Sequence, residues 1–495
     1  MKDILYRSTR SDAAPITASR AILQGLAPDG GLYVPVQMPA LDKSFSVLSR
    51  MSYQETAYEV MKLFLTDFSE QELKGCIQNA YDDKFDTEEI VPLVKVGDAW
   101  HLELFHGATI AFKDMALSLL PYLMTTAAVK NGEERQIVIL TATSGDTGKA
   151  ALAGFADVPG TKIIVFYPKN GVSAIQEKQM VTQKGDNTLV VGIDGNFDDA
   201  QNGVKAIFGD KALEQELSEA GYCFSSANSI NIGRLVPQIA YYVYGYARLL
   251  ARGEIAEGEP VNIVVPTGNF GNILAAFYAG KIGMPIGKLI CASNDNKVLY
   301  DFFQSGIYDR RREFILTSSP SMDILISSNL ERLIFELTGC DAAANQLLMD
   351  ALKETGVYGL TQEMKAGMDG FAAGFTTEQQ TAEAIARTYK SEGYVMDTHT
   401  AVAADVYRRY REETGDDAVT LLASTASPYK FTPSVMGAID DGLRGEDDFF
   451  LIERLREVSG TDIPQAIREI MTAPVRHRLV CTGQEMEQVV RDFLR

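Results

Sequence analysis

The stretch QIVILTATSGDTG, residues 136–148, decides the fold class. Residues 137–140 are all aliphatic, as in a strand that is buried on both faces of a sheet. The residues that follow are rich in glycine and hydroxyl groups, and a helix is predicted from Lys149 to Ala156. A buried strand, a short loop and a helix form the repeating unit of a parallel sheet, so the segment predicts an α/β fold.

The same alternation continues along the chain. Further strands are predicted at residues 162–166, 188–192 and 222–225, and helices at 176–183 and 198–220. The pattern returns with strands at 261–265, 288–292 and 418–423 and with helices at 234–252 and 273–281. We expect two units, each an open twisted parallel sheet covered by helices, with ligands at the carboxyl ends of the strands.

The first 95 or so residues differ from this pattern. They hold a stretch rich in glycine and proline at 27–39 and a region of helical periodicity at 53–65. The predicted organisation is an N-terminal domain over 1–95, a large α/β domain over 96–135 and 235–495, and a small α/β domain over 136–234.

Composition excludes several classes of function. The chain has 495 residues, and 46 Lys and Arg against 66 Asp and Glu give a net charge of -20, which disfavours nucleic-acid binding. Its 5 cysteines are scattered, which is typical of reduced thiols in the cytoplasm. Neither a signal peptide nor an apolar run long enough to span a membrane is evident. The sequence has no HExxH or CxxC spacing, so we predict no metal site.

Lys113 is the first candidate for chemistry. It lies in LFHGATIAFKD, residues 104–114, between Ala111, Phe112, Met115 and Ala116. An apolar setting lowers the pKa of a lysine and favours the neutral amine that attacks carbonyl groups. The alternative is a surface lysine whose stem lies along a half-buried helix.

Two loops between a strand and a helix have the composition of anion sites. They are TATSGDTG, residues 141–148, and PTGNFGN, residues 266–272, and their small residues let backbone N–H groups approach an anion. The first is not the phosphate-binding loop of nucleoside triphosphatases, because Ala150 follows Lys149 where Ser or Thr is required. The second lacks the GxGxxG spacing of dinucleotide sites. Ordinary glycine-rich turns remain the alternative.

Two further segments carry polar groups beside predicted elements. STASPYKF, residues 424–431, offers the hydroxyl of Thr425 and the cation of Lys430. NSINIGR, residues 228–234, groups amides, a hydroxyl and Arg234, a set that suits a carboxylate or a phosphate. A turn and a helix N-cap with an exposed arginine are the alternatives.

Taken together and in this order, the motifs resemble those of the threonine synthase family, in its long bacterial and fungal form. The resemblance covers nearly the whole chain. It rests on YRSTR (6–10), GLAPDGGLYVP (25–35), HGATIAFKD, TSGDTG, NSINIGR, GNFGN, SMDILISSNLER (321–332), DTHTAV (397–402) and STASPYKF. This sequence departs from the family pattern at Ala108, Ser427 and Tyr429, which puts in doubt any acid–base role at position 427.

The resemblance implies a tryptophan-synthase-β-like fold of type II, with pyridoxal 5'-phosphate (PLP) bound to Lys113 as a Schiff base. The other positions implied to hold the cofactor are Asp146 near its 3-hydroxyl, Thr425 at its pyridine nitrogen, and a phosphate cup of Gly268, Asn269, Phe270, Gly271 and Asn272. The positions implied to bind substrate are Ser144, Thr147, Asn228, Ser229, Arg234 and Lys430.

The implied activity is that of a cytoplasmic lyase, a monomer or homodimer, that converts O-phospho-L-homoserine and water to L-threonine and phosphate. The nearest alternative is another enzyme of the same fold, such as a serine or threonine dehydratase or a cysteine synthase. The long N-terminal unit and the second candidate anion site, around Arg234, argue against it. A regulatory protein that holds PLP without turnover is the alternative from another class, and the intact Lys113 argues against that.

Overall fold

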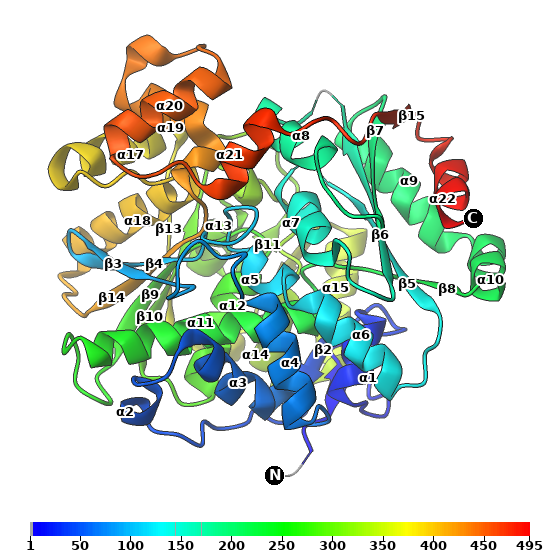
Figure 1. Ribbon diagram of the computed structural model, residues 1–495. Coiled ribbons are helices and arrows are strands. Elements are labelled where there is room, and N and C mark those ends of the chain that lie inside the picture. Colours follow the sequence, from blue (N-terminus) through cyan, green and yellow to red (C-terminus); the bar gives the residue numbers. More distant parts are fainter. Residues whose placement is uncertain (1–2, 144, 170) are drawn as a thin grey trace.

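The computed structural model describes residues 3–143, 145–169 and 171–495. Both predicted α/β units are present, each built on an open, mainly parallel sheet with helices packed on it (Figure 1). Every strand predicted from 136 to 423 is found, within a few residues of its expected bounds.

The smaller sheet has five strands in the order β15-β7-β6-β5-β8. They are β15 (Leu479–Cys481), β7 (Thr188–Ile193), β6 (Thr161–Pro168), β5 (Gln136–Ala142) and β8 (Tyr222–Ser225), and all the pairings are parallel. The larger sheet has six strands in the order β13-β10-β9-β14-β4-β3. They are β13 (Phe371–Phe375), β10 (Ile286–Ser293), β9 (Val261–Pro266), β14 (Thr420–Ser424), β4 (Ala99–Glu103) and β3 (Leu93–Val96), and β3 alone of these pairs antiparallel.

The helices that carry the candidate loops begin close to where the sequence predicts. They are α7 (Asp146–Phe155), α8 (Ala174–Val181), α11 (Ile232–Ala251) and α12 (Gly271–Lys281). The single helix predicted at 198–220 is wrong, because the structure has two, α9 (Phe197–Gly209) and α10 (Lys211–Glu219). Asp210 causes the break: its backbone is extended and its side chain accepts the N–H groups of Ala212 and Leu213, which starts a new helix.

The sequence predicts that the chain to residue 495 belongs to the large domain, but residues 479–494 pack on the smaller sheet. Strand β15 joins the edge of the smaller sheet beside β7, and α22 (Met486–Leu494) packs on α9. The packing is specific, since a Cβ on Gly203 of α9 would lie 2.2 Å from the sulfur of Met486. The apolar face of the sheet needs this cover, and the segment that provides it is remote in sequence.

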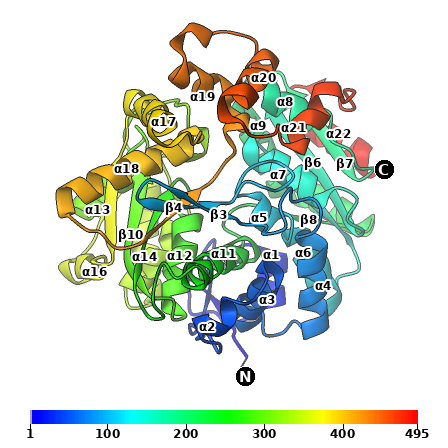
Figure 2. The same ribbon diagram turned by 60° about the vertical axis from the view of Figure 1, so that its left-hand side comes forward.

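The N-terminal residues form a short antiparallel pair, β1 (Tyr6–Ser8) with β2 (Tyr33–Pro35), followed by helices. The main helices here are α1 (Ala18–Gln24), α3 (Tyr53–Phe64) and α4 (Glu70–Ala80). Helix α3 packs against α11, and the two share one continuous core (Figure 2). This region therefore closes the large sheet on the side of α11.

Further helices connect and cover these elements. They are α5 (Asp114–Leu117), α6 (Leu120–Lys130), α13 (Val298–Ser305), α14 (Leu330–Leu337), α15 (Ala342–Glu354), α17 (Glu378–Glu392), α18 (Thr398–Thr414), α19 (Thr432–Ile439), α20 (Asp448–Ser459) and α21 (Gln465–Thr472). Among the described residues, no helix has the length and apolarity that crossing a membrane requires.

Candidate active site

Lys113 lies in the segment that follows strand β4, directly before α5. Strands β4 and β14 are parallel neighbours, so the segments that follow them leave the sheet at the same edge. There the Phe112 N–H donates to the Thr425 carbonyl at 2.8 Å, and Ala111 pairs with Ala426. The structure therefore brings together Lys113 and Thr425, two candidates that are remote in sequence.

The amine of Lys113 is held among polar groups in a buried setting. Its Nζ donates to the hydroxyl of Ser321 at 2.9 Å and lies 3.7 Å from Oδ2 of Asp146, and the side chain is 12% exposed. Burial lowers the pKa of Lys113 to about 8, against the attraction of Asp146, and the charges of Lys430 and Arg234 lower it further. A neutral amine is therefore accessible close to physiological pH.

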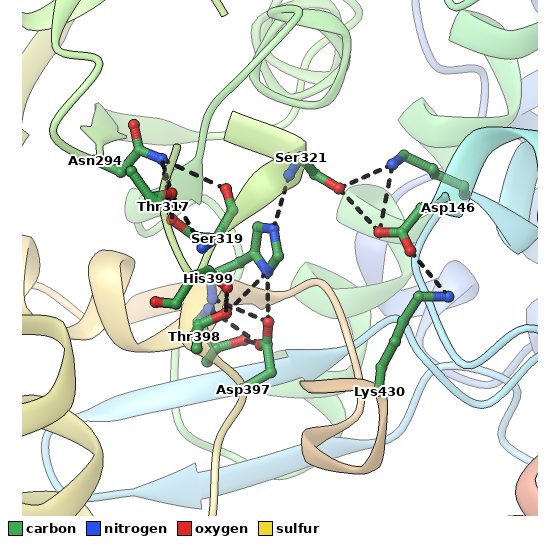
Figure 3. Close-up of polar contacts among 12 residues, drawn as sticks. Asp146, Asn294, Thr317, Ser319, Ser321, Asp397, Thr398, His399 and Lys430 are labelled. Atoms are coloured by element: carbon green, nitrogen blue, oxygen red, sulfur yellow. Dashed lines mark hydrogen bonds and ion pairs between the residues drawn. The ribbon is translucent and has the colours of Figure 1, made fainter. Parts of the chain in front are cut away.

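Asp146 is the carboxylate at the centre of this cluster (Figure 3). It is the first residue of α7, where a helix favours negative charge. Its Oδ1 lies 3.2 Å from Nζ of Lys430 and accepts from the Gln176 amide at 3.1 Å. Burial alone would raise the pKa of Asp146, but Lys430 and Lys113 more than offset it and hold that pKa well below its usual range. Asp146 is therefore a carboxylate at any physiological pH.

Lys430 is buried beside Asp146. Its side chain is 0% exposed, and its ammonium donates to the Thr109 carbonyl at 2.8 Å besides pairing with Asp146. These two internal partners leave the ammonium one further N–H to donate, so the contact of Lys430 with substrate stays a prediction. Lys430 also neutralises a buried carboxylate.

The glycine cup lies between strand β9 and helix α12. Phe270 has a left-handed backbone, with φ 64°, and this turn starts the helix. The cup carbonyls face the segment 321–329: Gly268 accepts from the Ser327 hydroxyl at 2.7 Å, and Asn269 accepts from the Asn329 N–H at 3.1 Å. The Phe270 ring packs near Phe303 and Phe371, so this residue can act on a ligand only through its backbone.

Asn272 completes the cup with an oriented amide. Its carbonyl oxygen accepts from the hydroxyl of Tyr241 at 2.6 Å and from that of Tyr242. Its Nδ2 is buried and has no partner among the described residues. An unpaired donor of this kind is costly without a ligand. With the first turn of α12, it suits an anion such as a phosphate.

Arg234 stands near the start of α11 and is 3% exposed. One terminal nitrogen donates to the Ala227 carbonyl at 2.9 Å, and the buried Nε has no partner in the part of the chain that the structure describes. Burial lowers the pKa of Arg234 to about 10. A buried guanidinium without a carboxylate is a strong candidate to bind an anion.

The other substrate candidates have fewer contacts. Asn228 is exposed and Ser229 is half-buried, and the Asn228 carbonyl accepts from Asn231 at 3.1 Å in the turn before α11. Thr147 is half-buried in the first turn of α7. Ser144 lies outside the described residues.

Several residues of the site carried no role in the sequence analysis. The Thr143 hydroxyl accepts from the N–H groups of Gly145 and Gly148, both at 3.0 Å, and so shapes the start of α7. Ser321 contacts both Lys113 and Asp146, and its own N–H donates to His399. The segments 321–332 and 397–402 resemble family motifs, but only the structure shows what their side chains contact.

Comparison with known proteins matches this chain to two family descriptions. Residues 5–81 match the family described as threonine synthase N terminus, and residues 99–425 match the family of pyridoxal-phosphate dependent enzymes. The second match spans the cup, Lys113 and Thr425.

Individual relatives are similar over most of the chain. Threonine synthase of Saccharomyces cerevisiae is 38% identical over 466 residues, covering 88% of this chain and 89% of that protein. The human protein threonine synthase-like 1 is 39% identical and covers 85% of this chain, which spans 58% of the relative. The PLP-bound structure of threonine synthase from Brucella melitensis has a TM-score of 0.88 and 35% identity, covering 99% of this chain and 100% of that one.

Proposed function

This chain belongs to the threonine synthase family of PLP-dependent enzymes, and we propose that it converts O-phospho-L-homoserine and water to L-threonine and phosphate. The observation that carries the proposal is the buried amine of Lys113, with its lowered pKa, beside a permanently charged carboxylate. A functional lysine needs this setting, whereas a structural lysine does not.

The residues present fit the cofactor. The unpartnered Nδ2 of Asn272 and the start of α12 suit its phosphate, with Gly268, Asn269, Phe270 and Gly271 lining the cup. We propose that Lys113 binds its aldehyde, that Asp146 faces its 3-hydroxyl and that the neutral Thr425 hydroxyl faces its pyridine nitrogen. When bound, PLP supplies an electron sink for negative charge on the substrate carbons.

The chain's own residues would orient the substrate and move its protons. We propose that Lys113, once released, removes the proton at Cα and then acts at Cβ, since its pKa is close to the working pH. Arg234 would hold the substrate phosphate through its unpaired Nε, assisted by Asn228, Ser229 and Thr147. Lys430 belongs to the same proposed set, because its ammonium has two internal partners and a third N–H to donate.

Three finer statements belong to the same proposal. The reaction eliminates phosphate, so the enzyme is assigned as a carbon–oxygen lyase acting on phosphate. We further propose a cytoplasmic location, and a monomer or homodimer, which size-exclusion chromatography with light scattering would distinguish.

The test is to follow phosphate release from O-phospho-L-homoserine with the purified protein and to identify threonine as the product. Borohydride reduction followed by peptide mapping should find the cofactor on Lys113. Lys149 is a useful reference for the labelling, because burial also lowers its pKa to about 8. Unlike Lys113, its amine donates to the side chain of Gln183, at 2.5 Å. Label on Lys149, or faster deamination of serine than use of phosphohomoserine, would refute the proposal.

A further inference from the structure

Ser321 joins the two charged groups at the centre of the site (Figure 3). Its Oγ lies 2.9 Å from Nζ of Lys113 and 3.0 Å from Oδ2 of Asp146. Because Asp146 is a carboxylate, it can only accept, so the Ser321 hydroxyl must donate to it. The lone pairs of Oγ are then directed to the Lys113 amine. Ser321 therefore presents that amine with an acceptor of fixed orientation.

The backbone of Ser321 is fixed by a buried histidine–aspartate pair. The Ser321 N–H donates to Nε2 of His399 at 3.1 Å, and Nδ1 of His399 lies 2.7 Å from Oδ2 of Asp397. Asp397 caps α18, where it also accepts the N–H groups of His399 at 2.9 Å and Thr400 at 3.0 Å. An anionic acceptor at Nδ1 places the proton there and leaves Nε2 free to accept. His399 is 3% exposed and Asp397 is 0% exposed, so water does not compete.

The same segment contacts the cofactor cup. A Cβ on Gly268 would lie 2.3 Å from the Ser321 carbonyl, so only glycine allows this approach. Ser321 lies in a short 3-10 turn that follows Ser319. The Ser319 hydroxyl accepts from the Asn294 amide at 3.0 Å. The Ser318 carbonyl accepts from the Thr398 hydroxyl at 2.7 Å. Ser321 is thus held from α18 on one side and against the cup on the other.

We propose that Ser321 is a catalytic residue that receives the Lys113 amine after its release from the cofactor, and that Asp397 and His399 are positioning residues for Ser321. The proposal rests on the role of Lys113 proposed above. A lysine that acts at two carbons in turn must return to a defined place between the two steps, and Ser321 provides that place. The charged groups that face Lys113 are Asp146, Lys430 and Arg234, and all of them stay in place in the variants below.

The first experiment uses Ser321→Ala in the full-length protein freed of PLP. The pKa of the Lys113 amine is measured from the pH dependence of its chemical labelling. Removing an acceptor from the ammonium should lower that pKa by about one pH unit. Ser318→Ala is the matched control, because the Ser318 hydroxyl donates to Glu378 and not to Lys113. An unchanged pKa in Ser321→Ala, or an equal shift in Ser318→Ala, would overturn the role of Ser321.

The second experiment measures turnover of the loaded enzyme. Ser321→Ala should lower kcat about ten- to a hundredfold with little change in KM, since the amine acts after substrate is bound. Ser321→Thr keeps a hydroxyl and should recover most of kcat, which also covers the case in which the alanine variant does not fold. Failure of the threonine variant to exceed alanine, with both folded, would refute the assignment.

The third experiment tests the positioning pair. His399→Gln keeps an acceptor for the Ser321 N–H, whereas His399→Leu removes it. The glutamine variant should retain the Lys113 pKa and most of kcat, and the leucine variant should reproduce the changes of Ser321→Ala. Equal behaviour of the two variants would refute the positioning role. If the wild-type cofactor is found on another lysine, the proposed function fails, while the labelling of Lys113 still tests its contact with Ser321.

Discussion

Replacing Lys430 with methionine tests whether this lysine neutralises Asp146 or binds substrate. Methionine keeps much of the apolar stem but removes the charge that lies 3.2 Å from Oδ1 of Asp146. The carboxylate is then left in a buried site with Lys113 as its nearest cation, at 3.7 Å. Breaking a buried ion pair by removing one partner costs about 3–5 kcal/mol. We expect Lys430→Met to lose that much free energy of unfolding.

The same change should act on Lys113. Burial is the main cause of its lowered pKa, and repulsion from Lys430 adds to it, so the variant should raise the pKa of Lys113 above about 8. With more of the amine protonated, capture of PLP at neutral pH should slow, and the loss should be recovered at higher pH. Stopped-flow absorbance measures the capture rate, and urea unfolding followed by circular dichroism measures stability.

Lys74→Met is the matched control. Lys74 pairs with Glu70 at 2.6 Å on the surface of α4, where the two side chains are 49% and 65% exposed. Such pairs contribute about 0.3–0.5 kcal/mol, so this variant should unfold almost as the wild type does. The reasoning would be refuted if Lys430→Met kept full stability and only raised KM for phosphohomoserine, which is the behaviour of a substrate ligand.

Three further predictions concern the proposed ligand contacts. Arg234→Ala should keep the cofactor absorbance but lower kcat/KM for phosphohomoserine about ten- to a hundredfold. This is the effect expected from losing a charged hydrogen bond of about 1.5–3 kcal/mol. Full activity would refute the contact. Thr425→Asp should retain PLP but lose most threonine formation, because a carboxylate would hold the pyridine nitrogen protonated; unchanged turnover would count against this placement. In the wild type, the rate of PLP capture should rise with pH and level off above about 8, since only the neutral amine of Lys113 attacks the aldehyde. A capture rate independent of pH from about 6 to 10 would contradict the lowered pKa.

Local patterns predicted strands β5 to β10 and β14, because each is a short, apolar run with its own flanking turns, but they missed β3, β4 and β13 of the larger sheet. They failed at 198–220, where helical periodicity runs through Asp210 and only the cap of a second helix reveals the break. They also missed β15, three residues long and with two of its three side chains exposed, because its pairing with β7 depends on a neighbour almost 290 residues away. Periodicity carries no information about such contacts.

For the candidate site, the sequence by itself determined which segments are candidates for chemistry: the lysine in its apolar run, the glycine cup and the polar loops after strands. These are properties of contiguous residues, set by local backbone and side-chain preferences. Only the tertiary structure decided which charges meet. It paired Lys430 with Asp146, placed Ser321 between Lys113 and Asp146, and left one donor each of Arg234 and Asn272 without a partner among the described residues. The physical reason is that pairing and burial depend on distance in space, and parallel sheets bring together loops that lie far apart along the chain.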